Sequence, residues 1–166
     1  MDGSRLFDSR TGSLLLALAS GALLAGALAL QYGADLAPCR LCVWQRYPHA
    51  GVVVLGLVGW FWQPRLMLGL AGLLLLGNVG LAGWHYGIEQ GWWALPAGCA
   101  AGADASSVEE LKAMLAEAPP ACDQVSFTLL GLSLAAWNAI ACLGLAAYAC
   151  IAATPYGERP LRTASG

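Results

Sequence analysis

Two cysteines separated by two residues, Cys39 and Cys42, are the clearest candidates for chemistry in this sequence. Their spacing is that of a redox dithiol. If a helix includes Cys42, then Arg46 lies one turn further along the same face. A helix N-terminus and a guanidinium group both favour a thiolate over a thiol. The motif therefore predicts that Cys42 is in part a thiolate and a better nucleophile at neutral pH than an ordinary thiol.

This motif has three other interpretations: a zinc site, a haem attachment site and a structural disulfide. Half of a zinc site has the same spacing, but the next two cysteines, Cys99 and Cys122, are much further apart than two to four residues, and no loop histidine stands at a ligand spacing. Attachment of haem needs a histidine after the second cysteine, where Val43 stands instead. An inert structural disulfide remains an alternative interpretation of the pair. The residues favour redox chemistry, and no metal site is expected.

A second pair of cysteines, Cys99 and Cys122, lies in a long connection at about 88–125. Loops of this length are usually functional or disordered. A disulfide between the two cysteines would close the loop, and the local sequence does not separate a structural bridge from a catalytic one. The last two cysteines, Cys142 and Cys150, fall within an apolar segment, where we expect them to be buried hydrophobic residues.

Long apolar segments must position these cysteines. The chain is 58% hydrophobic and 11% charged, whereas soluble domains average about 25% charged residues, which excludes an ordinary soluble enzyme. The net charge of −2 offers no basic surface for nucleic acid. Four uncharged runs reach the roughly 20 residues that a membrane-spanning helix needs. They place spans near 13–32, 47–63, 66–87 and 126–151.

These spans predict an all-α integral membrane protein. Because lipid offers no partner to a free backbone N–H, spanning segments must be helices or a closed barrel, and segments without alternating polarity favour helices. We expect one membrane domain over residues 1–166, built as a four-helix bundle with two extracytoplasmic loops at about 33–46 and 88–125. The first span starts like a signal peptide, but its apolar stretch is longer than usual for one. We expect it to be retained as a helix.

The positive charges predict the orientation of the bundle. With both termini in the cytoplasm, five Lys and Arg residues lie inside and three lie outside. The inside residues are Arg5, Arg10, Arg65, Arg159 and Arg162, and the outside residues are Arg40, Arg46 and Lys112. Both loop pairs of cysteines then lie on the outer side, where disulfides form and persist.

The third predicted span carries polar residues on one face. Asn78 and His85 are seven residues apart, and Leu81 and Ile88 belong to the same stripe. We expect Asn78 to form a hydrogen bond between helices. His85 lies near the outer end of its helix, at the depth of the first cysteine pair. There it is expected to line a pocket for an apolar electron carrier.

Three stretches of this sequence resemble the bacterial disulfide bond formation protein B (DsbB) family of membrane oxidases. Residues 38–46 match its C-x-x-C-x-x-Q-R signature, and residues 84–93 are similar to the end of its third helix. Residues 122–138 are similar to its entry into the fourth helix. With four spans and two cysteine pairs in the same order, the resemblance covers nearly the whole chain. It departs at Phe127, where many members carry Trp.

The resemblance implies a relay of thiol–disulfide exchange. Cys99 would accept the thiolate of a reduced, periplasmic DsbA-like protein with a thioredoxin fold, and Cys122, once released, would attack Cys39. This implies an enzyme of the bacterial inner membrane, with both termini in the cytoplasm and the redox loops in the periplasm.

A quinone would take the electrons from the relay. The resemblance implies that Cys42, freed by the exchange, faces a bound ubiquinone or menaquinone, with Arg46 and His85 beside its ring. Together with the stripe on the third span, the expected quinone-binding residues are Arg46, His85, Leu81 and Ile88.

Two other functions fit part of the sequence. Enzymes similar to vitamin K epoxide reductase also couple a C-x-x-C motif to a quinone within a helical bundle, but their active motif usually lies near the end of a late helix. A non-catalytic membrane bundle held together by two inert disulfides is the second alternative. It predicts cysteines that resist mild reductant and no copurifying quinone.

Overall fold

Helices account for most of the residues that the structure describes. The computed structural model describes residues 8–97, 99, 107–109, 112 and 120–154. Much of the predicted second loop, and the arginines Arg5, Arg159 and Arg162, therefore lie outside the described residues. The described elements are α1 (Ser9–Gly33), α2 (Arg40–Trp44), α3 (Arg46–Phe61), α4 (Pro64–Glu89), β1 (Thr128–Leu129), β2 (Leu132–Ser133) and α6 (Leu134–Ala153).

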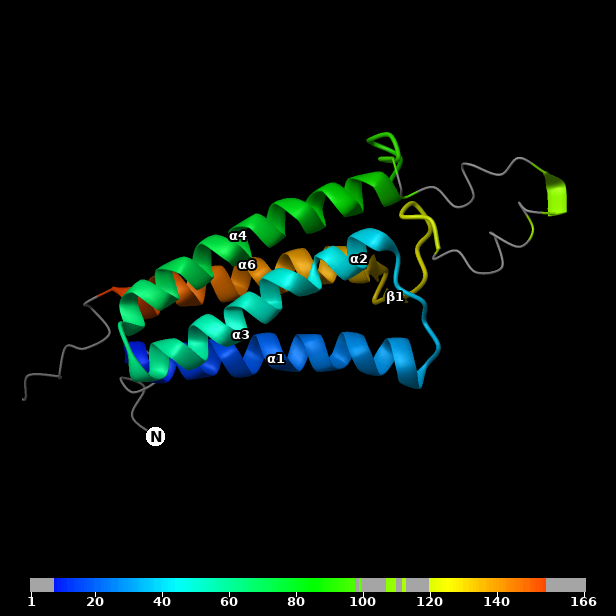
Figure 1. The fold of residues 1–166 in the computed structure, drawn as a ribbon. Helices are drawn as coiled ribbons and strands as arrows, with labels where there is room; N and C mark the ends of the chain where they lie inside the picture. Colours follow the sequence, from blue (N-terminus) through cyan, green and yellow to red (C-terminus); the bar gives the residue numbers. More distant parts are fainter. Residues whose placement is uncertain (1–7, 98, 100–106, 110–111, 113–119, 155–166) are drawn as a thin grey trace, which may run out of the picture.

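The four longer helices lie side by side (Figure 1). α4 packs mainly against α6 and α3, and α1 packs mainly against α3. The start of α1, the turn between α3 and α4 and the end of α6 share one end of the molecule, and α2 and the strands β1 and β2 share the other (Figure 1). The segments that carry the chemistry are thus gathered at a single end.

Three of the helices, α1, α4 and α6, are long and apolar enough to cross a membrane. The prediction of spans is confirmed for these three, although α1 begins earlier than expected, at Ser9. Its start is fixed by Asp8, whose carboxylate accepts the backbone N–H of Thr11 at 3.1 Å. α3 covers most of the second predicted span but has only 16 residues.

The fourth predicted span starts too early, because residues 128–133 form a short antiparallel hairpin instead of helix. Leu130 and Gly131 both have positive φ values, 52° and 80°, which turn the chain back on itself. The helix begins only at Leu134, where the Ser133 hydroxyl caps it by accepting the backbone N–H of Ala136 at 3.3 Å. An uncharged run in the sequence reveals neither the turn nor the cap, so the length of the run overestimated the length of the helix.

Small residues bring α1 and α3 close together. A Cβ atom built on Gly56 would lie 2.5 Å from the carbonyl oxygen of Ser13 and 2.8 Å from the Cβ of Ala17. Close contact through small residues is the usual way in which membrane helices pack. The core between the helices is formed by Leu16, Val52, Leu68, Ala71, Leu75, Cys142, Ala146, Ala149 and Ala152.

Candidate functional site

The first cysteine pair sits at the start of α2. Cys39 is the N-cap residue of this helix, and its Sγ accepts the backbone N–H of Cys42 at 3.2 Å. The two Sγ atoms are 3.0 Å apart, and both cysteines are free. Cys39 is 4% exposed, whereas Cys42 is partly exposed. A single helical turn therefore holds two thiols together, one facing the interior and the other reaching the edge of the protein.

Cys39 is the thiolate of the reduced pair. The hydrogen bond that it shares with the Cys42 thiol is the main reason that the pKa of Cys39 is lowered to about 4, and burial opposes this shift. A hydrogen bond from His85 lowers this pKa further. The pKa of Cys42 is raised, because its thiol is bonded to Cys39 and is partly removed from water. This differs from the sequence-based prediction, because Cys39 is stabilised as the thiolate by its hydrogen bonds with Cys42 and His85 and, to a smaller extent, by the backbone N–H that it caps.

We expect one thiolate of the reduced pair to persist in weak acid. Because the pKa of Cys39 is lowered, its thiolate is present at neutral pH and is lost as the pH falls through about 4. The measurement is the pH dependence of thiolate ultraviolet absorbance in protein carrying Cys99→Ser and Cys122→Ser. Adding Cys39→Ser should remove the signal at low pH. A single midpoint near the ordinary thiol value of 9.0 would contradict the assignment.

His85 lies directly behind the cysteine pair and is 2% exposed. Its Nε2 is 3.5 Å from the Sγ of Cys39, and its Nδ1 is 2.8 Å from the side-chain nitrogen of Gln45. Because the Gln45 amide donates to Nδ1, the ring hydrogen of a neutral His85 must lie on Nε2. His85 can therefore donate to the Cys39 sulfur, which stabilises the thiolate.

The second cysteine pair forms a disulfide between Cys99 and Cys122. Both residues are buried, and the backbone N–H of Cys122 donates to the carbonyl oxygen of Cys99 at 3.2 Å. The pair packs with Cys39, Leu41 and Ile88 in one buried cluster. The fold thus brings together the four loop cysteines that the sequence analysis identified.

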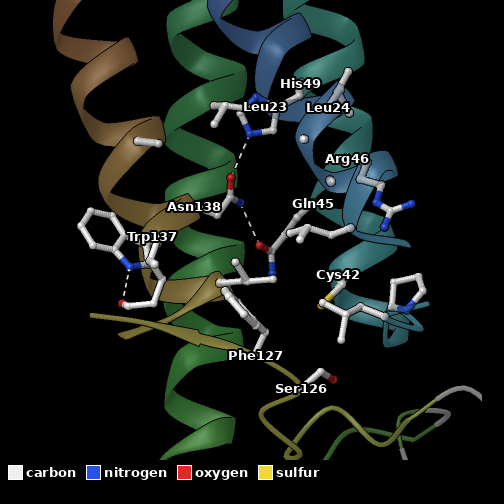
Figure 2. A pocket seen from close by; sticks show the side chains of 18 of the residues that line it. Leu23, Leu24, Cys42, Gln45, Arg46, His49, Ser126, Phe127, Trp137 and Asn138 are labelled. Carbon is white, nitrogen blue, oxygen red and sulfur yellow. Dashed lines mark hydrogen bonds between the residues drawn. The ribbon is translucent and has the colours of Figure 1, made fainter. Parts of the chain in front are cut away.

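A cavity of about 450 Å³ opens beside Cys42. Figure 2 shows Cys42, Gln45 and Arg46 on one side of it and Phe127, Trp137 and Asn138 on the other. Most of the remaining lining is apolar and comes from α1 and from residues near the start of α6. The residues from these two regions are Ala22, Leu23, Leu24, Gly26, Ala27, Leu30, Ser126, Leu129, Leu134 and Ala141.

Of the four residues expected to bind a quinone, Arg46 lines this cavity and the other three do not. His85, Leu81 and Ile88 share one face of α4, as their spacing predicts, but that face packs against the cysteine cluster. Spacing along a helix identifies a shared face without identifying the neighbour that the face meets. Arg46 itself begins α3, where its Nη1 donates to the side-chain oxygen of Gln31 at 2.5 Å.

Three polar residues of the site were not assigned to it from the sequence. The Asn138 amide donates to the Gln45 side-chain oxygen at 2.8 Å, and His49 Nε2 is 2.9 Å from the Asn138 oxygen. All three line the cavity (Figure 2). His49 is a polar residue one turn after Gln45 and lies within a predicted span, and this position was the signal in the sequence that pointed to it. Gln45 therefore links the cavity to His85 and, through it, to Cys39.

The remaining polar and cysteine positions are partly as expected. Asn78 is fully buried and donates to the Gln45 carbonyl oxygen at 3.1 Å and to the Cys142 sulfur at 3.3 Å, which confirms a bond between helices. Cys142 is buried, as predicted, but Cys150 is exposed and the prediction for it is wrong. The inward face of α6 contains Cys142, Ala146 and Ala149, and Cys150 follows this face by one residue.

Comparison with known proteins identifies close similarity to one family. The family model described as disulfide bond formation protein DsbB matches residues 9–152. A disulfide bond formation protein B of Methylococcus capsulatus is 36% identical over 152 residues, covering 85% of this chain and 92% of the relative. Another, from Aromatoleum aromaticum, is 30% identical over 151 residues, covering 85% and 89%.

A third relative matches over a shorter stretch. The disulfide bond formation protein B of Herminiimonas arsenicoxydans is 42% identical over 85 residues, which are 49% of this chain. The match spans about half of that relative, 54% of its length. No solved structure matches the chain.

Proposed function

The chain belongs to the DsbB family of disulfide bond formation proteins, and on that premise we propose that it reoxidises a periplasmic DsbA-like dithiol oxidase and passes the electrons to a membrane quinone. One observation carries this proposal above the others. The disulfide Cys99–Cys122 and the dithiol sulfur of Cys39 pack in one buried cluster, while Cys42 lines the neighbouring cavity. The four sulfurs thus form a path from the loop that carries Cys99 and Cys122 to the mainly apolar cavity.

The exchange steps balance as two successive thiol–disulfide exchanges. A thiolate of the reduced partner attacks Cys99, so that a partner–Cys99 disulfide forms, the Cys99–Cys122 bond breaks and Cys122 leaves as a thiolate. Cys122 then attacks Cys39 of the oxidised first pair, and Cys42 leaves as a thiolate. The second thiolate of the partner attacks the sulfur bonded to Cys99 and releases the partner as a disulfide. Cys99 then displaces Cys39 from Cys122, which restores the Cys99–Cys122 disulfide.

The two cysteines of the first pair have different roles because they lie in different positions. Cys39 is buried in the cluster that contains Cys122, and its low pKa makes it a good leaving thiolate in the last exchange. His85 stabilises that thiolate from behind, held by Gln45. Cys42 is partly exposed and lines the cavity, so it is the sulfur that can meet an electron acceptor there.

The cavity fits a quinone. Its volume of about 450 Å³ lies within the roughly 300–1,000 Å³ of small-molecule sites, and its walls are mainly apolar with polar groups gathered near Cys42. Arg46 and His49 would hold the oxygens of the head group, and Leu23 and Leu30 of α1 would hold apolar substituents. When bound, ubiquinone or menaquinone supplies an acceptor for two electrons and two protons. In this proposal His85 acts on Cys39 and lies outside the quinone cavity.

The membrane setting follows from the same features. Three long apolar helices in a member of this family make the chain a membrane protein. We place it in the bacterial inner membrane, with both termini in the cytoplasm and the cysteine pairs in the periplasm. The start of α1 and the end of α6 lie at the end away from the cysteine-bearing α2 (Figure 1), which supports this orientation.

Filling the cavity tests where the quinone binds. Ala27 lines the cavity from α1, so we expect Ala27→Trp to raise the KM for ubiquinone about tenfold, equivalent to about 1.4 kcal/mol of binding free energy. Ala29→Trp on the same helix is the matched control, because Ala29 is exposed and does not line the cavity. The measurement is partner-driven quinol formation at increasing quinone concentration. An unchanged KM in both variants would exclude this cavity.

A further inference from the structure

The side chains of Cys39, Cys42 and His85 offer three metal-binding atoms that all lie within 4.8 Å of one another. The sequence argued against a metal because the cysteine pair had no further ligand nearby in the chain. The fold supplies that ligand from α4, which carries His85 against the start of α2. Thiolate sulfur and imidazole nitrogen are the ligands that Zn²⁺ prefers, and C-x-x-C is a usual zinc spacing.

The distance between the Cys39 sulfur and the His85 nitrogen suits a tetrahedral ion. Zn–S bonds of about 2.3 Å and Zn–N bonds of about 2.0–2.1 Å at tetrahedral angles separate a sulfur from a nitrogen by about 3.5 Å and two sulfurs by about 3.8 Å. Cys39 Sγ and His85 Nε2 are already 3.5 Å apart. The two sulfurs are 3.0 Å apart, and a small side-chain rotation of the partly exposed Cys42 opens that gap.

Glu89, on the next turn of α4, adds a carboxylate beside these three side chains. Its Oε1 is 3.8 Å from His85 Nε2, and its side chain is 6% exposed. Its Oε2 is buried without a hydrogen-bond partner in the part of the chain that the structure describes. The charge of Glu89 also contributes to raising the pKa of Cys42, after the hydrogen bond with Cys39 and burial. A thiolate and a carboxylate in a largely buried space favour a cation there.

The neighbouring arginines do not neutralise this cluster. Arg40 lies over the Trp44 ring, 5.5 Å from its centroid, and Arg46 donates to Gln31. Gln45 is the outer partner of this ligand. Metal at His85 Nε2 moves the ring hydrogen to Nδ1, and a half-turn of the Gln45 amide lets its oxygen accept that hydrogen in place of the Asn138 amide.

We propose that the reduced Cys39–Cys42 pair forms with His85, and beside the Glu89 carboxylate, a binding site for a thiophilic divalent cation of the Zn²⁺ type. Binding displaces the thiol protons and changes no oxidation state. Formation of the Cys39–Cys42 disulfide removes both sulfur ligands, so the cation binds only the reduced form. If the proposed function holds, the bound cation blocks electron transfer until a chelator removes it.

Cobalt is the probe for this site, because Co²⁺ takes tetrahedral thiolate sites and gives visible absorption bands. The full chain in detergent, with Cys99→Ser and Cys122→Ser so that one loop dithiol remains, is reduced anaerobically and titrated with Co²⁺ without quinone or partner. We expect one Co²⁺ per chain, tetrahedral thiolate bands, and displacement of Co²⁺ by Zn²⁺. The same protein oxidised to the Cys39–Cys42 disulfide should show no bands.

A variant that removes a ligand and a variant that leaves the site intact give a matched comparison. Loss of an outer partner of a metal ligand lowers affinity about 10–100-fold, so His85→Ala, which removes a ligand, should lower it by at least that factor. Cys150→Ser, which removes an exposed cysteine of α6, should keep the parent affinity. The proposal is overturned if the reduced parent gives no bands, if the oxidised protein binds equally, or if both variants bind as the parent does. Since no quinone is present, these outcomes do not depend on quinone reduction.

Discussion

Replacing Cys42 with serine should lower partner-driven quinol formation by about 10³-fold or more, the scale of loss seen when a reacting nucleophile is removed. Cys42 is the cysteine of the first pair that lines the cavity, and Cys39 is buried behind it. Without Cys42, the first pair can no longer form a disulfide or release a thiolate into the cavity. The measurement is quinone reduction by the purified protein with a reduced DsbA-like partner.

The control for this variant is Cys150→Ser. Cys150 is an exposed cysteine on α6 and lies away from the site, so this variant should keep the parent rate. Parent-like quinol formation by Cys42→Ser would remove Cys42 from the electron path. Equal loss in both variants would point to a general effect of cysteine replacement.

Replacing Cys122 with serine should trap the partner on this protein. The structure pairs Cys99 with Cys122, so loss of Cys122 leaves Cys99 without its partner thiol. The Cys99 thiolate then attacks the disulfide of an oxidised partner, so that a partner–Cys99 disulfide forms and one partner thiolate leaves. No Cys122 thiolate is present to displace the partner from Cys99 and carry the exchange on to Cys39. The measurement is a reductant-sensitive adduct between this chain and a protein with a thioredoxin fold, isolated from cells and identified by mass spectrometry.

The matched variant carries Cys99→Ser together with Cys122→Ser and should form no adduct. An expressed and inserted Cys122→Ser protein without any adduct would favour the alternative of a membrane bundle held by inert disulfides. That alternative also gives no reason for Cys42 to line a cavity of about 450 Å³.

The sequence predicted the long helices well because their signal is local. Uncharged runs located α1, α4 and α6, since a charge within a span is costly and is therefore avoided. The hairpin at 128–133 was missed because it depends on positive φ values at Leu130 and Gly131, which hydropathy does not encode.

The site was predicted only as far as residue types allow. The four loop cysteines and His85 stand out by type and spacing, but the neighbours of each depend on contacts between distant parts of the chain. Gln45 is the clearest example, because its role depends on hydrogen bonds with His85 on α4 and Asn138 on α6. The thiolate was placed on Cys42 because the sequence does not show that Cys42 and His85 are both bonded to the Cys39 sulfur.

Direct exchange between the two cysteine pairs is the central claim, and one cross-link tests it. In protein carrying Cys42→Ser and Cys99→Ser, the loop cysteines that remain are Cys39 and Cys122, which pack in one buried cluster. Mild oxidation of the folded protein in membranes, followed by peptide mass spectrometry, should find a disulfide between them in most chains. Recovery of both as free thiols, or labelling of the two from opposite sides of the membrane, would contradict the relay.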